Sequence, residues 1–148
     1  MSLTRWLANH WLVEHRTSAS EIAELLELVD RDLGDAAIEQ LSSDWRMGIA
    51  YNAALQLATI ALAASGYRPA RERAHERTIL ALRYTVELDQ STIDTLDSVR
   101  RRRNISNYER AGTASSSEAA EVYEIASDLR AKVVRWLEEE HPALVRTT

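Results

Sequence analysis

The residues with the most distinctive chemistry in this chain are four consecutive arginines at 100–103 and the polar residues that follow them. Asn104, Asn107 and Tyr108 lie within the next five positions. A buried arginine needs a carboxylate, backbone carbonyls or a phosphate as its partner. The pattern therefore indicates either ion pairs within the fold or a site for a phosphate.

A helical wheel places part of this run on the side that faces the core. At about 100° per residue, Ile93, Leu96 and Val99 define an apolar arc. Arg103 falls near the centre of that arc, and Asn107 lies beside it one turn later. The apolar stripe thus ends in an arginine–asparagine pair, which is the strongest sign of a binding site in the chain.

The other polar residues of this helix point elsewhere. Arg100 lies on one flank of the arc, Arg102 lies well away on the other side, and Arg101 points nearly opposite. Asn104 and Tyr108 form a second pair on the neighbouring face. Basic residues near a helix C-terminus also suit the helix dipole, and many exposed arginines are only solvated. For Arg101 and Arg102 this structural role weighs as much as a functional one.

Charge is spread unevenly along the chain, whose net charge is -5. Residues 1–67 hold four basic and nine acidic side chains, residues 68–110 hold ten and seven, and residues 111–148 hold four and seven. A globally acidic protein with one basic strip is a poor general DNA binder. It is suited to holding a phosphate or a short RNA at one place.

The elements that must position these residues are helices. With 22 Ala, 18 Leu, four Gly and two Pro, the composition favours helix over sheet. Periodicity and capping signals predict an all-α fold, an antiparallel up-and-down bundle of five to six helices. The helices are expected over about 3–15, 18–33 with Gly34 as a left-handed stop, 44–65, 69–86, 91–108 with a cap at Ser91, and 116–141 with a capping box at 115–118.

The helix over 44–65 is predicted to be central. Between Ile49 and Ala64 its polar residues are Asn52, Gln56 and Thr59, so nearly all of its sides must be buried. The four tryptophans match core spacing, although the first two could also form a dimer or partner surface. They are Trp6, Trp11, Trp45 and Trp136.

Residues 102–108, late in a helix of an all-α chain, resemble the motif region of HEPN domains. The start of the central helix, 44–54, resembles the family's aromatic residue followed by Ala. The stretch 66–79, which includes His75, resembles the segment after that helix, and Trp136-Leu137 fits the family's final helix. The resemblance covers about residues 43–140.

This resemblance implies a four- or five-helix bundle that is commonly dimeric. Active HEPN members are metal-independent ribonucleases with an Arg, then four to six residues, then a His. The Arg holds the scissile phosphate, the His assists attack by the ribose 2′-hydroxyl, and two motifs meet in a cleft at the dimer interface. Many members are toxins beside a small nucleotidyltransferase antitoxin, and some of these antitoxins adenylylate a Tyr in the motif.

The sequence departs from the HEPN pattern at its catalytic position. The places allowed for the His hold Asn107, Tyr108 and Glu109. A phenol, with a pKa of about 10, is a poor base at neutral pH. The catalytic candidates are therefore Arg103 with Tyr108, or with His75 brought in by the fold, although a packing or surface role is the default for that His. Asn107-Tyr108 resembles the Asp-Tyr or Asn-Tyr variants of HEPN proteins, which are interpreted as nucleotide- or RNA-binding modules.

Three functions follow, in order of preference. The first is a homodimeric HEPN-like module that binds RNA or nucleotide phosphate, as a component of a toxin–antitoxin or nucleotidyltransferase-linked system. The second is an active ribonuclease toxin, and the third is a protein-interaction subunit, paired with a nucleotidyltransferase, that makes no nucleic-acid contact. The predicted phosphate-binding residues are Arg100, Arg102, Arg103, Asn104, Asn107 and Tyr108.

We expect no metal site and no cofactor. Glu72-x-x-His75 and Glu138-x-x-His141 match one element of di-iron bundles, but the central helix supplies none of the further inward-facing glutamates. Residues 1–148 are expected to form a single domain, with N-terminal helices over 1–42, a HEPN-like core over 43–140 and a tail over 141–148. The N-terminus has no apolar signal region, so a cytoplasmic, non-membrane protein is expected.

Overall fold

The computed structural model describes residues 2–106 and 114–145, and of residues 103–106 it describes the backbone only. The chain is mainly helical, as predicted, and it adds a small two-stranded sheet that was not predicted. In chain order the elements are α1 (Leu3–Ala8), β1 (Leu12–Glu14), α2 (Ala19–Ala36), α3 (Ser43–Ala64), β2 (Tyr67–Pro69), α4 (Ala74–Leu80), α5 (Leu82–Thr85), α6 (Gln90–Ser106), α7 (Ser116–Glu140) and the 3-10 turn η1 (Pro142–Leu144).

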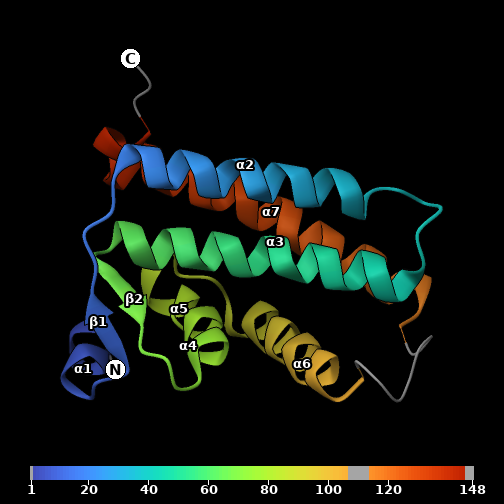
Figure 1. Cartoon of the computed structure of the whole chain (residues 1–148), viewed down its shortest axis with the longest axis horizontal. Coiled ribbons are helices and arrows are strands. Elements are labelled where there is room, and N and C mark those ends of the chain that lie inside the picture. The colour runs from blue at the N-terminus through green and yellow to red at the C-terminus, as the bar shows by residue number, and fades with distance from the viewer. Residues whose placement is uncertain (1, 107–113, 146–148) are drawn as a thin grey trace.

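The long helices alternate in direction along the chain, in agreement with an up-and-down order. Figure 1 shows α2 and α6 running one way and α3 and α7 the other. However, α3 and α7, which share a direction, also pack side by side, because α3 lies at the centre and contacts both α2 and α7. The starts of α3 and α7 therefore meet at one end of the bundle. The sheet lies at the opposite end.

The central position of α3 follows from its composition. Six of its alanines are buried and allow the neighbouring helices to approach closely. Gln56 Nε2 donates to Asp32 Oδ2 of α2 at 2.7 Å, so this polar residue is paired across the interface. The helix α3 is long and apolar enough to span a membrane, but 61% of its most apolar stretch is buried inside the protein. Packing in the core accounts for its composition.

The predicted helix over 3–15 is wrong beyond Ala8. His10 has a positive φ of 63°, and the chain then forms β1, which pairs antiparallel with β2. Leu12 is buried with Trp6 against α3, so burial of this side chain favours the strand. Since the partner strand is distant in the sequence, local spacing did not predict the pairing.

The predicted helix over 69–86 is also wrong at its start. Pro69 ends β2, and α4 begins only at Ala74, after Arg73 in the left-handed region at φ 55°. The expected stop at Gly34 lies inside α2; among the described glycines, the one with a left-handed φ is Gly66, at 99°, just after α3. Both errors arise because Gly and Pro favour the interruption of a helix without determining the residue at which the helix begins or ends.

Most helix starts agree with the predicted capping residues. The Ser18 side chain accepts from Glu21 N at 3.1 Å, and Ser115 forms the expected capping box with Glu118. The predicted cap at Ser91 is wrong, because Asp89 accepts from Thr92 N at 3.1 Å and α6 starts one residue before Ser91.

The tryptophans divide between core and surface. Trp6 is buried, whereas Trp45 is 68% exposed on the first turn of α3. The expectation that Trp45 belongs to the core is therefore wrong. The residues one and two turns further along the same side of α3, Gly48, Ile49 and Asn52, are only half-buried, so this side of the helix does not face the centre of the core.

Candidate functional site

The arginine run lies on the second half of α6, at the end of the bundle where α3 and α7 begin (Figure 1). The apolar arc of this helix is buried as predicted. Ile93 and Leu96 are fully buried and Val99 is nearly so. The arc anchors α6 against the helices around it, so the arginines that follow are held at a defined place.

Arg100 and Arg101 share one carboxylate on the same helix. Arg100 Nε donates to Asp97 Oδ1 at 2.9 Å, and the Arg100 side chain is only 17% exposed. Arg101 Nε lies 3.5 Å from Asp97 Oδ2, and its side chain is 63% exposed. Asp97 was not among the predicted site residues, although a carboxylate three and four positions before two arginines is a recognisable helical pairing signal.

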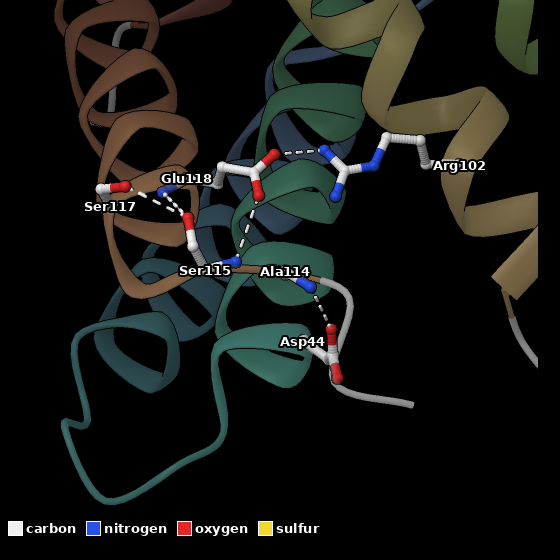
Figure 2. Close-up of polar contacts among 6 residues, drawn as sticks. All are labelled: Asp44, Arg102, Ala114, Ser115, Ser117 and Glu118. Atoms are coloured by element: carbon white, nitrogen blue, oxygen red, sulfur yellow. Dashed lines mark hydrogen bonds and ion pairs between the residues drawn. The ribbon is translucent and has the colours of Figure 1, made fainter. Parts of the chain in front are cut away.

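Arg102 connects α6 to α7. Its guanidinium forms an ion pair and hydrogen bond with Oε2 of Glu118, in the first turn of α7 (Figure 2). The other oxygen of that carboxylate accepts from Ser115 N at 3.1 Å, while Glu118 N donates to Ser115 Oγ at 3.1 Å. Glu118 therefore caps its own helix and binds the neighbouring one at the same time.

These contacts stabilise the charged form of Glu118. The hydrogen bond from Arg102, followed by the one from the Ser115 backbone, lowers the pKa of the Glu118 carboxyl below its usual value. The positive end of the α7 dipole acts in the same direction. Glu118 is therefore ionised at neutral pH, and it neutralises the charge of Arg102.

A second carboxylate closes the same end of the bundle. Asp44, in the first turn of α3, accepts from Ala114 N at 2.9 Å through Oδ1 (Figure 2). This bond ties the chain just before α7 to the start of α3. We refer to Asp44, Arg102, Ser115 and Glu118 as the closing cluster, since together they join α3, α6 and α7. Its long-range partners could not be predicted from the sequence.

A groove of about 360 Å³ lies between α6 and α7, beside the closing cluster. Its described lining holds the carboxylates of Asp94, Glu118 and Glu121 and the single guanidinium of Arg102. The groove is therefore acidic, and Coulomb repulsion opposes the entry of a phosphate. An anion would have to approach from outside the groove, where Arg101 is exposed.

The remaining predicted residues do not join this arrangement within the described part of the chain. For Arg103 and Asn104 only the backbone is described, and Asn107 and Tyr108 lie outside the described residues. His75 is exposed on the first turn of α4, and among the described residues no hydrogen bond or ion pair joins it to the arginine run. The structure thus unites Arg100, Arg101 and Arg102 with carboxylates, and leaves His75 apart from them.

The two Glu-x-x-His pairs have different surroundings. Glu72 precedes α4, and His141 ends α7 with its ring 4.7 Å from the Trp136 ring in an edge-on contact. Among the side chains that the structure describes, no group of three or more His, Asp or Glu residues is arranged to hold a metal ion.

Comparison of the chain with protein-family models, with curated proteins and with solved structures gave no match.

Proposed function

We propose that the chain is a HEPN-like helical module that binds the phosphate of RNA or a nucleotide at the C-terminal end of α6, without efficient cleavage. The observation that carries the proposal is the run of four consecutive arginines in the last part of α6, of which Arg101 has a side chain that is 63% exposed. The run lies at the end of the bundle where α3 and α7 begin (Figure 1).

Within this site the arginines have separate tasks. Arg102, which is paired with Glu118, links α6 to α7, and Arg100 is paired with Asp97 within α6. Arg101 is more exposed and has a longer contact, 3.5 Å, with Asp97, so exchanging this contact for a phosphate costs little. We therefore add Arg101 to the proposed ligand contacts, together with the following residues of the motif. These are Arg103, Asn104, Asn107 and Tyr108.

Cleavage is expected to be weak because the motif lacks its His. If RNA is cleaved, the base must be Tyr108 or His75. A phenol is almost fully protonated at neutral pH, and the described contacts do not bring the imidazole of His75 to the arginines. Binding without efficient turnover is the expectation.

The test is RNA binding measured together with RNA cleavage. The double variant Arg101→Ala, Arg103→Ala should lose at least tenfold in affinity and should show a shallower dependence of affinity on salt. Arg16→Ala is the matched control, because this exposed arginine lies before α2 at the other end of the bundle. Equal binding by wild type and double variant would refute the proposal, and cleavage lost in the double variant would establish a ribonuclease instead.

We also propose a homodimer in the cytoplasm, with a nucleotidyltransferase as a further partner. Both follow from the HEPN resemblance of 102–108. Light scattering at micromolar concentration should give twice the mass of 16.7 kDa. A monomer at that concentration would count against the two-motif cleft.

One observation favours the third function, a protein-interaction subunit. Trp45 is 68% exposed at the same end of the bundle as the acidic groove. Large aromatic side chains contribute strongly to protein interfaces. If this surface is the interface, Trp45→Ser should weaken dimerisation, or binding to a nucleotidyltransferase, at least tenfold. RNA binding by the arginine run should be unchanged in this variant.

A further inference from the structure

A second cavity lies at the other end of the bundle, away from the arginine run. It has a volume of about 420 Å³ and is formed by α2, α3, β2 and the residue just after β1. Much of its lining is apolar, from Leu25, Leu28, Ala63, Tyr67 and Pro69. Leu28 is 38% exposed, one of the few large apolar side chains at the surface in the described chain. A ligand with an apolar body would cover it, which is favourable.

One wall of the cavity carries an oriented histidine. His15 Nε2 lies 2.7 Å from Glu21 Oε1, and Thr17 Oγ1 donates to the same oxygen at 2.7 Å. A carboxylate only accepts, so Nε2 carries the hydrogen and Nδ1 of the neutral ring is an acceptor. The backbone is held as well, because His15 N donates to Gly66 O at 2.9 Å. In its neutral form the ring therefore offers an acceptor in a fixed orientation.

The charge of the described lining is negative when His15 is neutral. Among the described residues, Glu21 and Glu24 supply two carboxylates, against the single guanidinium of Arg68. Glu24 is exposed and makes no hydrogen bond or ion pair within the part of the chain that the structure describes. The cavity thus combines an apolar lining with the Glu24 carboxylate, which accepts hydrogen bonds, and the imidazole of His15, whose Nδ1 accepts while the ring is neutral.

We propose that this cavity binds a small amphipathic amine. The apolar body of the ligand packs on Leu25, Leu28 and Tyr67, and its ammonium donates to Glu24 and to Nδ1 of His15. An ammonium has three donors and no acceptor, which matches this set of acceptors. The volume lies within the range of small-molecule sites. This site is independent of the phosphate site on α6, which lies at the opposite end of the bundle.

The experiment titrates the full-length chain with 2-phenylethylamine, and with phenylacetate and 2-phenylethanol as its anionic and neutral counterparts. Amide chemical shifts in NMR spectra locate the binding. We expect about millimolar affinity for the amine, as suits a ligand of this size, with shifts confined to residues around the cavity. The alcohol should bind more weakly than the amine, and phenylacetate should bind weakest.

Two variants on the same helix test the carboxylate. Glu24→Gln should weaken amine binding roughly two- to fivefold, the effect of one exposed ion pair. Glu27→Gln removes an exposed carboxylate of α2 that does not line the cavity, and it should leave binding unchanged. The proposal is overturned if phenylacetate binds tightest, if Glu24→Gln has no effect, or if the amine produces no shifts around the cavity at about 10 mM.

Discussion

The two ends of the bundle are held together by different forces. At the end where α3 and α7 begin, the closing cluster joins three helices through carboxylates, a guanidinium and helix caps. At the opposite end, the Trp6 ring packs edge-on against Trp11 and Tyr84, at centroid distances of 5.5 and 5.6 Å. Contacts between charged groups therefore contribute to the first end and should respond to salt, whereas the packing of aromatic rings contributes to the second and should respond to side-chain size.

The largest expected effect is at the aromatic end. Trp6→Ala removes a buried indole next to Leu12 and should lower the free energy of unfolding by about 3–5 kcal/mol, measured by urea denaturation. Trp45→Ala is the matched control, because that side chain is exposed, and it should change stability by less than about 0.5 kcal/mol. Equal losses in the two variants would show that burial does not distinguish the two tryptophans.

A smaller loss is expected at the closing cluster. Glu118→Ala removes both the capping box of α7 and the partner of Arg102, and it should cost about 1 kcal/mol. Glu121→Ala, one turn later on α7, lacks those contacts and should be nearly neutral. Thermal unfolding at low and high salt measures both variants. If the two ends differ as we describe, added salt should reduce the Glu118 effect and leave the Trp6 effect unchanged.

The dependence of stability on pH involves a carboxylate at each end. The hydrogen bond from His15, followed by the one from Thr17, lowers the pKa of the Glu21 carboxyl below its usual value, and the pKa of Glu118 is lowered as well. A carboxyl with a lowered folded-state pKa contributes stability above its unfolded pKa, and this contribution is lost as pH falls through the folded value.

Acid titration should therefore destabilise the wild type below about pH 4.5, and Glu21→Gln or Glu118→Gln should each flatten that loss. Circular dichroism between pH 6 and 3 is the measurement. If the acid transition of a variant has the same shape and midpoint as that of the wild type, the replaced carboxylate does not contribute to the loss of stability in acid.

The smallest effect is expected from the loss of a cation–π contact at the aromatic end. The Arg77 guanidinium lies 4.5 Å from the centroid of the Trp11 ring. Arg77→Met keeps most of the side-chain volume and removes the charge, which should cost about 0.5–1 kcal/mol in urea denaturation. A loss as large as that of Trp6→Ala would mean that charge, rather than burial, holds this end as well.

Agreement between sequence and structure is best where the deciding contacts are local. The caps at Ser18 and Ser115 depend on residues three positions apart, and the sequence is sufficient to predict them. The central place of α3 and the buried arc of α6 follow from the proportion and spacing of apolar residues. Each of these properties belongs to a single helix.

The candidate site could be predicted only in part. The arginine run and its position late in a helix follow from the sequence, and Asp97 could have been added from its spacing. The Arg102–Glu118 pair could not, because its partners belong to different helices whose packing brings them together. The pair gives Arg102 a structural role, because it stabilises the packing of α6 against α7. Arg101, by contrast, is exposed.

By itself, then, the sequence determined a helical protein, its central helix, most helix starts and one basic segment, because helix periodicity and capping act over a few residues. Tertiary structure alone decided that Leu12 lies in a strand beside Pro69, that Trp45 is exposed and that His15 faces a cavity. These outcomes depend on the burial of side chains against elements distant in the chain, and local spacing does not encode that burial.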